Sequence, residues 1–159
     1  MISDAVILER ALSFAKVEMH TIGLQCRRLR TKEPEDEEFR LRWWADLQFL
    51  IVALTRLRRS VELAQKVTSA KKNLSSALKI FDKTLPDLIT MRNVGEHFDV
   101  YVRGKGKNKT VSPKSLQTGT FDRTTYKWLD KSINIDAAHK AAEELYSALL
   151  NLKKSLCQR

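Results

Sequence analysis

The chain has 159 residues, of which 43% are hydrophobic, so it is long enough for one domain with an apolar core. Lysine and arginine together number 29 and aspartate and glutamate 19, which gives a formal net charge of +10 at pH 7. A balance this basic favours polyanionic partners such as RNA, DNA or an anionic membrane surface. The alternative is a basic protein without any nucleic-acid role.

Several classes of protein are excluded by what the sequence lacks. No apolar run approaches the ~20 residues of a membrane span, and the first residues lack the basic segment of a signal peptide. Cys26 and Cys157 are far apart and belong to no C-x-x-C motif, so neither a zinc site nor a disulfide scaffold is indicated. We therefore expect a soluble cytoplasmic protein, a single domain over residues 1–159, with no metal, no cofactor and no membrane partner.

A first amphipathic helix of about 25 residues is predicted by apolar or small residues at alternating steps of three and four. Its narrow stripe contains Ala5, Leu8, Leu12, Ala15, Met19, Ile22, Cys26 and Leu29. Arg27, Arg28 and Arg30 follow at its end, where cations suit the negative pole of a helix dipole. The same three arginines could instead contact phosphates.

A second long helix is predicted after Pro34, because this proline and the acids of 33–38 are typical of a helix N-terminus. Trp43 and Trp44 fall near its stripe and are interpreted as core or subunit packing. The stripe continues through Leu47, Leu50, Ile51, Leu54 and Val61 and ends near Val67.

A basic patch follows the most apolar part of this second helix. It contains Arg56, Arg58 and Arg59. We interpret Arg56 and Arg59 as candidate RNA-binding residues, which would add to the arginines of the first helix if the two helix ends lie together. Solvated helix charges are the alternative.

A third helix is predicted after a break at 68–70, with Asn73 as its N-cap. Its apolar residues are Leu74, Ala77, Leu78 and Phe81. Pro86 then either kinks this helix or starts a new one.

The next segment, 85–106, carries polar side chains at helical spacing that a solvated face does not explain. Pro86 suits a first helical turn and Gly104 a C-terminal stop, so we predict a helix of roughly five turns. One side of this helix forms a core stripe of Leu88, Met91, Val94, Gly95, Phe98, Tyr101 and Val102, in which the glycine permits close packing. The other side predicts a face with a partner, because it carries Ile89, Arg92, Asn93, Glu96, His97 and Val100.

Arg92, Asn93 and His97 are the candidate catalytic residues of this face, with Glu96 and Tyr101 as supporting residues. An imidazole can move a proton to or from a ribose hydroxyl, and a guanidinium can stabilise charge on a phosphate without metal. Arg92 and His97 diverge by about 140° on one straight helix, so we expect a two-fold dimer to bring two copies of the face together. The structural alternative is an Arg92–Glu96 ion pair and an Asn93–His97 hydrogen bond, each at i, i+4 spacing.

A basic loop follows, with Lys105, Lys107 and Lys109 separated by glycine and asparagine. It does not match a P-loop, because a helix and not a strand precedes it. A phosphate-contacting loop and a solvated connector are both open, and we name the three lysines as candidate RNA-binding residues.

Helical periodicity disappears from Val111 to Asn134. The run Tyr126-Lys127-Trp128 predicts a strand that pairs with a neighbour around Ile133 across a turn at Asp130 and Lys131. We therefore expect a small β-hairpin or an irregular excursion around 110–134. Asp136 then caps a last helix that closes the bundle, with the stripe Ala138, Ala142, Leu145, Leu149, Leu152 and Leu156.

Residues 92–97 resemble the motif of the HEPN family, in which an arginine, usually followed by a polar residue such as asparagine, precedes a histidine by four to six intervening residues. The resemblance covers residues 60–150 best. It implies an all-α, up-and-down bundle of four to five helices, here with the insertion around 110–134. It also implies a homodimer that cleaves RNA without metal, using Arg92 and His97 of both subunits in a shared cleft and Asn93 to orient the phosphate or the histidine.

Three classes of function follow. The first is a HEPN-like metal-independent endoribonuclease that leaves a 2′,3′-cyclic phosphate, in the setting of a toxin or a stress or defence effector. An antitoxin or regulatory protein is then an expected partner, although Asp99 stands where toxins paired with nucleotidyltransferases often carry a modifiable tyrosine. The second is a non-catalytic basic helical module that binds RNA, a nucleotide or a protein partner, and a purely structural dimer is a third possibility.

Overall fold

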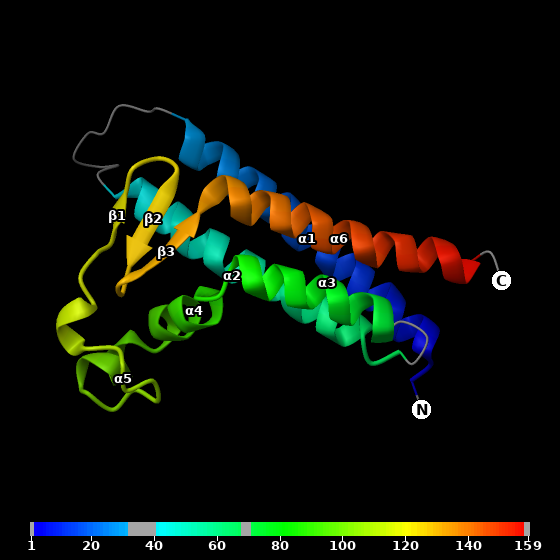
Figure 1. Ribbon diagram of the computed structural model, residues 1–159, viewed down its shortest axis with the longest axis horizontal. Coiled ribbons are helices and arrows are strands. Elements are labelled where there is room, and N and C mark those ends of the chain that lie inside the picture. Colours follow the sequence, from blue (N-terminus) through cyan, green and yellow to red (C-terminus); the bar gives the residue numbers. More distant parts are fainter. Residues whose placement is uncertain (1, 32–40, 68–70, 158–159) are drawn as a thin grey trace.

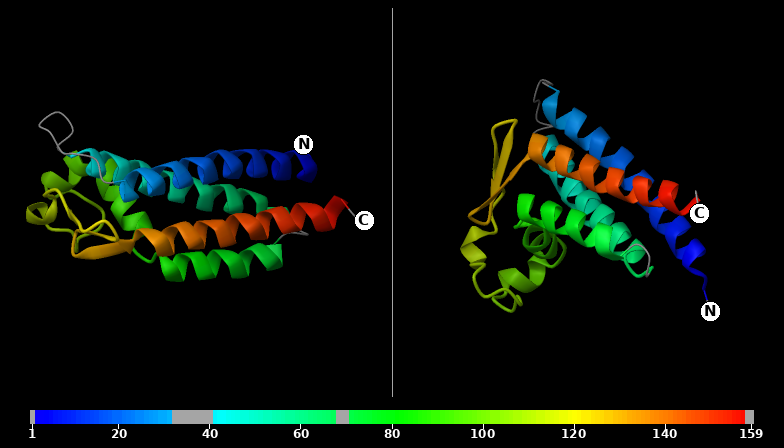
Figure 2. Two further views of the ribbon diagram at one scale, coloured as in Figure 1. Left: turned by 90° about the horizontal axis from the view of Figure 1, so that it is seen from above. Right: turned by 45° about the vertical axis from the view of Figure 1, so that its right-hand side comes forward.

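The computed structural model describes residues 2–31, 41–67 and 71–157 of the chain (Figure 1). The helices α1 (Asp4–Arg30), α2 (Arg42–Ala64), α3 (Lys71–Thr84) and α6 (Ile135–Cys157) lie side by side as a bundle. Their directions alternate in chain order, as the colours of Figure 1 show. The segments between α3 and α6 gather at one end of this bundle, and two further views show the same arrangement (Figure 2). The predicted helical fold with an inserted β segment is therefore confirmed.

The helix α1 begins where Ser3 caps it, with the Ser3 hydroxyl accepting a hydrogen bond from the Val6 amide at 3.4 Å. Of the predicted stripe, Leu8, Leu12, Ala15, Ile22, Cys26 and Leu29 are buried and Met19 is partly buried, and Ala11 is buried beside them. Burial raises the pKa of the Cys26 thiol to about 11, so this cysteine is a packing residue and not a thiolate nucleophile.

The helix α2 is the centre of the bundle, because it packs against α1, α3, α6 and the short helix α4 (Leu88–Glu96). Its core side chains are almost completely buried at Leu47, Leu50, Ile51, Leu54, Leu57 and Val61. Each buried leucine or isoleucine of this kind stabilises the fold by roughly 2 kcal/mol relative to an exposed position. The acidic segment 33–38, predicted to begin this helix, lies outside the described residues.

The inserted sheet consists of β1 (Thr120–Phe121), β2 (Thr125–Trp128) and β3 (Lys131–Asn134), paired antiparallel in that order. The predicted pairing of Tyr126 with Ile133 is confirmed. The turn, however, is formed by Leu129 and Asp130, with φ of 57° and 58°, and not by Asp130 and Lys131. Two consecutive positive φ angles are those of the two-residue turn that matches strand twist, which places Lys131 in β3.

Aromatic rings attach this sheet to the start of α2. The Trp44 ring centroid lies 5.3 Å from that of Trp128 and 5.8 Å from that of Tyr126, and both pairs are edge-to-face. Trp43 stacks on Phe121 at 6.1 Å. The interpretation of the two adjacent tryptophans as packing residues is therefore confirmed.

The predicted five-turn motif helix is wrong, because the structure divides it into α4 and the short helix α5 (Phe98–Val102). The break lies at His97, whose φ of −123° and ψ of 31° are not helical. Leu88, Met91 and Val94 are buried as predicted. Phe98 and Val102 are 61% and 54% exposed, because the change of direction at His97 turns them out of the core stripe. Pro86 lies in the turn before α4, so a new helix starts there.

Two predicted caps are also corrected. The helix α3 begins at Lys71, two residues before Asn73. In α6 the capping side chain belongs to Asn134, whose Oδ1 accepts a hydrogen bond from the Ala137 amide at 2.9 Å. Asp136 instead forms an ion pair with Arg30 at 2.6 Å. No helix among residues 2–31, 41–67 and 71–157 is both long and apolar enough to cross a membrane.

Asn134→Ala should lower the free energy of unfolding by about 1 kcal/mol, because it removes the cap of α6. Asp136→Ala breaks an exposed ion pair, so its effect should be about 0.5 kcal/mol or less. Urea unfolding of both variants measures the difference. A larger loss for Asp136→Ala would show that the aspartate is the cap.

Candidate functional site

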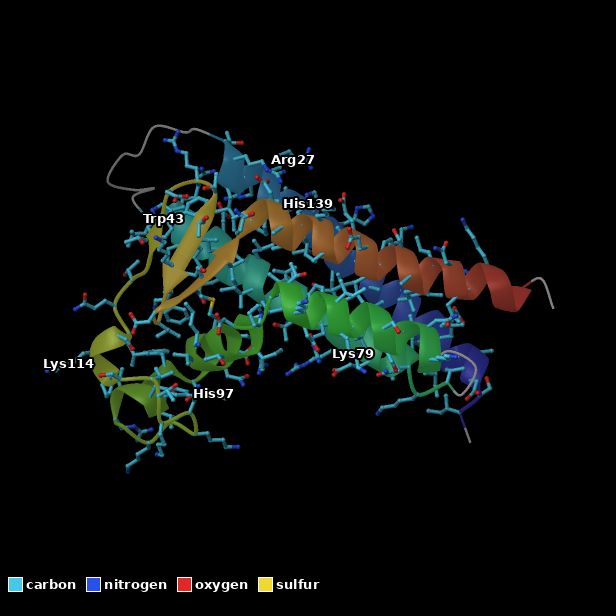
Figure 3. All side chains as sticks on the ribbon, viewed as in Figure 1. Arg27, Trp43, Lys79, His97, Lys114 and His139 are labelled. Atoms are coloured by element: carbon cyan, nitrogen blue, oxygen red, sulfur yellow. The ribbon has the colours of Figure 1, made fainter. Side chains whose placement is uncertain are left out.

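The motif residues lie at the end of the bundle where α4 turns into α5, and Figure 3 labels His97 at this place. A pocket of about 340 Å³ opens there. Its lining comes from the last turn of α4, from α5 and from the basic loop, namely Asn93, His97, Val100, Tyr101, Gly106 and Lys107. The structure thus brings Asn93, His97 and Lys107 together around one space.

Arg92 does not line this pocket. Its guanidinium forms an ion pair with Glu96, one helical turn further on, and its Nη1 donates a hydrogen bond to Asn93 Oδ1 at 2.9 Å. The ion pair is the structural alternative stated from the sequence. Because Asn93 Oδ1 accepts this bond, the amide of Asn93 has its Nδ2 donors to offer to a ligand in the pocket.

His97 is held by its backbone at the break between the two helices. Its amide donates to the Asn93 carbonyl at 3.1 Å, and its carbonyl accepts from the Val100 amide at 3.0 Å. This is a main-chain bond, and among the described residues no hydrogen bond joins the Asn93 and His97 side chains, which was the alternative stated from the sequence. The side chain is exposed, and among the described residues no hydrogen bond or ion pair holds its imidazole. It can exchange protons with a ligand.

Tyr101 packs against the basic loop and so helps to position it at the site. Its ring is only 7% exposed, and its hydroxyl accepts a hydrogen bond from the Asn108 amide at 3.3 Å. Gly106 lies directly on the ring, since a Cβ added to this glycine would be 2.2 Å from Tyr101 Cδ1. The Lys105 amide also donates to the Val100 carbonyl at 3.0 Å. These contacts place Lys107 at the pocket.

The other predicted RNA-binding residues do not line this pocket. Lys105 and Lys109 are exposed on the same loop. Arg56 lies 3.9 Å from Glu18 of α1. Gln48 of α2 lies beside Gly95 and so marks the level of the site along this helix. Arg56 lies about 12 Å further along the helix axis than Gln48, so Arg56 and the exposed Arg59 lie apart from the site.

The arginines of the two long helices do not form one patch. Arg28 pairs with Asp46 at 2.8 Å near the start of α2, whereas Arg58 pairs with Asp82 of α3 at 2.6 Å and also with Glu62. The hydrogen bond to Asp82 raises the pKa of Arg58 further above its ordinary value. For Arg28 and Arg58 the structure therefore favours a structural role over phosphate binding, because carboxylates of neighbouring helices already pair with their guanidinium groups.

Sequence reasoning missed Gly106 as part of the site. The only signal was a glycine among lysines five residues after Tyr101, because a glycine in a loop can mark a close approach of the backbone to a nearby side chain. Gly95 was placed correctly on the packed side. A Cβ at this position would lie 2.9 Å from Gln48 Oε1, so the glycine lets α4 approach α2.

In the part of the chain that the structure describes, no group of three or more His, Cys, Asp or Glu side chains is arranged to hold a metal ion. His20 is exposed on α1, and His139 lies 3.8 Å from Glu143 of its own helix. Neither histidine belongs to the pocket of His97.

Gly106→Ala should lower the free energy of unfolding by about 1–3 kcal/mol, because its methyl group meets the buried ring of Tyr101. Gly23→Ala is the matched control, since a Cβ there meets nothing within 4 Å and lies on a helix, where alanine is favoured. Denaturant unfolding compares the two. Equal stability of both variants would contradict the contact between the loop and the ring.

Comparison of the chain with protein-family models, curated proteins and solved structures finds no match. No relative therefore supplies a role for any residue of the pocket. The functional interpretation depends on the side chains that this structure places around His97 and on the motif they belong to.

Proposed function

We propose that the protein is a HEPN-like, metal-independent endoribonuclease that acts as a homodimer. The observation that supports it best is the exposed, unbonded imidazole of His97 beside Asn93 and Lys107 in one pocket. Arg92 adjoins this pocket through its hydrogen bond to Asn93. The strongly basic chain suits an RNA substrate.

The reaction needs only groups of this kind. A base removes the proton of a ribose 2′-hydroxyl, the 2′-oxygen attacks the adjacent phosphorus, and the bond to the 5′-oxygen of the next nucleotide breaks. The products are a 2′,3′-cyclic phosphate and a 5′-hydroxyl that receives a proton from an acid. His97 serves as base or acid, while Lys107 and the Asn93 amide bind the phosphate and Arg92 stabilises its developing charge.

A dimer would supply what one protomer lacks. One imidazole cannot be base and acid in the same transition state, whereas two copies of His97 can divide these roles. Three apolar side chains of α4 and α5 are exposed near the site, since Ile89, Phe98 and Val102 are 41%, 61% and 54% exposed. In a two-fold dimer the same patch meets itself, which would cover these side chains and bring the two pockets together.

The competing function is a non-catalytic module that binds RNA, a nucleotide or a protein partner. The ion pair between Arg92 and Glu96 favours it, because the carboxylate offsets the positive charge that the reaction requires. A biological role as a toxin or as a stress or defence effector follows only if the protein is a ribonuclease. Asp99, which replaces the modifiable tyrosine, is paired with Arg103 at 3.3 Å.

Purified protein should cleave mixed cellular RNA in the presence of EDTA and leave 2′,3′-cyclic phosphate ends. His97→Ala should lower the cleavage rate by about 100-fold or more, because it removes the proton-transferring group. His20→Ala, which changes an exposed histidine of α1, should leave the rate unchanged. Gel analysis of the fragments and of their ends measures both effects.

The role of Arg92 is separated from its ion pair by comparison with Glu96→Ala. Arg92→Ala should slow cleavage at least 10-fold, whereas Glu96→Ala should leave the rate within about threefold of wild type. If both variants lose only stability and RNA remains intact with the wild-type protein, the enzymatic proposal is wrong.

Phe98→Asp should convert a dimer into a monomer, because it places a charge in the apolar patch beside His97. Its cleavage rate should fall while His97 remains present. Phe14→Asp, at a side chain that is 58% exposed on α1, is the control and should change neither property. Analytical ultracentrifugation measures the mass, and a wild-type protein that is monomeric while it cleaves RNA would contradict the shared site.

A further inference from the structure

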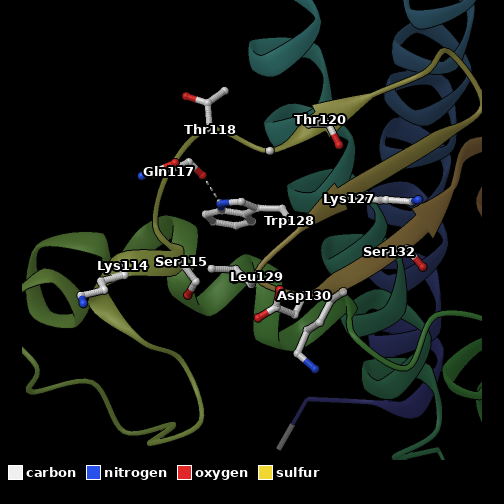
Figure 4. Close-up of a pocket in the computed structure, with 12 residues that line it drawn as sticks. Lys114, Ser115, Gln117, Thr118, Thr120, Lys127, Trp128, Leu129, Asp130 and Ser132 are labelled. Atoms are coloured by element: carbon white, nitrogen blue, oxygen red, sulfur yellow. Dashed lines mark hydrogen bonds between the residues drawn. The ribbon is translucent and has the colours of Figure 1, made fainter.

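We propose that a second pocket binds the sugar–phosphate backbone of the RNA strand whose scissile bond lies at His97. The identity of the strand as RNA rests on the proposed ribonuclease function. This pocket, here called the β-turn groove, has a volume of about 540 Å³ and lies between the segment 114–120 and the turn that joins β2 to β3 (Figure 4).

The charge of the β-turn groove is the first support. Lys114, Lys127 and Lys131 line it and come from three separate segments, whereas Asp130 is the one acidic residue among the described residues that line it. Lys131 is held by Asp87 at 2.8 Å. Lys114 and Lys127 are exposed at two sides of the groove (Figure 4), and within the described residues neither has a carboxylate at ion-pair distance, although Lys127 lies near enough to Asp122 to help lower the pKa of that carboxyl. Both ammonium groups are therefore accessible to phosphates.

Hydroxyl groups supply the second support. The register places Thr120, Lys127 and Ser132 side by side across the three strands, so a lysine stands between two hydroxyls on one face of the sheet. Ser115 also lines the groove, but its hydroxyl already donates a hydrogen bond to the Ser112 carbonyl at 2.7 Å. Lysine with serine and threonine is a common donor set for phosphate oxygens, which carry no base identity.

The floor of the groove is rigid. The Trp128 indole, which is only 6% exposed, donates a hydrogen bond to the Gln117 carbonyl at 2.8 Å and so holds the segment that forms one wall. Gly119 allows this wall to reach β2, because a Cβ there would lie 2.3 Å from the Lys127 carbonyl oxygen. Since the indole is buried and already bonded, it shapes the groove and offers no face for base stacking.

The groove is connected with the pocket of His97 through two short helices. The 3₁₀ helix η2 (Pro113–Ser115) carries Lys114 and Ser115 and packs against α5, which supplies Val100 and Tyr101 to the His97 pocket. Lys114 of the one space and His97 of the other thus lie at the same end of the bundle (Figure 3). A strand that crosses the contact of η2 with α5 reaches both spaces.

The test uses a fluorescently labelled single-stranded RNA and the full chain with His97→Ala, so that the probe stays intact during the measurement. Lys114→Glu with Lys127→Glu should weaken binding by about 10-fold or more, and should reduce the slope of log affinity against log salt by about 1.4, since two phosphate contacts are lost. Lys79→Glu with Lys153→Glu changes the net charge equally at exposed positions of α3 and α6 and should weaken binding by about twofold at most. Circular dichroism verifies that all variants are folded.

Equal losses in the two double variants would overturn the groove, because binding would then follow net charge alone. A second outcome would also overturn the proposal. In that outcome inorganic phosphate binds at the groove, but the double variant Lys114→Glu with Lys127→Glu keeps its full affinity for RNA. The two proposals fail separately. Groove-dependent RNA binding without any cleavage by the wild-type protein contradicts the ribonuclease and keeps the groove, whereas His97-dependent cleavage that the groove variants retain in full contradicts the groove alone.

Discussion

The packing of aromatic rings between α2 and the inserted sheet is the interaction on which the functional end of the molecule depends. Trp44 meets both Tyr126 and Trp128 edge-to-face, and Trp43 stacks on Phe121. Burial raises the pKa of the Tyr126 phenol well above its ordinary value, which keeps it neutral in this cluster. Together with the direct junction of β3 and α6 and the ion pair of Lys131 with Asp87, these contacts fix the position of the sheet on the bundle. Without the ring contacts the β-turn groove would lose its floor, and Gly95 of the motif would lose a neighbour, since an added Cβ there lies 3.9 Å from the Trp128 ring.

The distribution of charge separates the structural cations from the available ones. Several arginines of the long helices contact carboxylates, as in the pairs of Arg28 with Asp46 and Arg58 with Asp82. Such pairs hold neighbouring elements in place and leave little charge for a ligand. The lysines of the inserted segments are different, because Lys107, Lys114 and Lys127 line pockets and are exposed. A net charge of +10 alone does not distinguish these two populations.

The bundle helices could be predicted from the sequence, because their apolar periodicity continues over many turns and a shift of one or two residues at an end does not change the pattern. The β2–β3 pairing was also accessible, since alternating aromatic residues precede a short turn. The break at His97 was not, because the apolar spacing of 88–102 fits a continuous helix, and the turn of α5 against η2 is a tertiary contact. For the same reason Phe98 and Val102 were assigned to the core. Of the three candidate catalytic residues, Asn93 and His97 share a pocket as the motif predicts. The ion pair of Arg92 with Glu96 was considered from the sequence only as the alternative to a catalytic role.

The direct passage from β3 into α6 has a further consequence. Asn134 ends the strand and caps the helix, so no linker separates them. One residue added at or removed from this junction would rotate the apolar stripe of α6 by about 100° relative to the sheet, or would turn the buried face of β3 to the other side. The junction of β3 and α6 therefore does not tolerate a change of length, whereas the turns of the sheet and the loop before β1, which carries lysines, are not bound by this constraint.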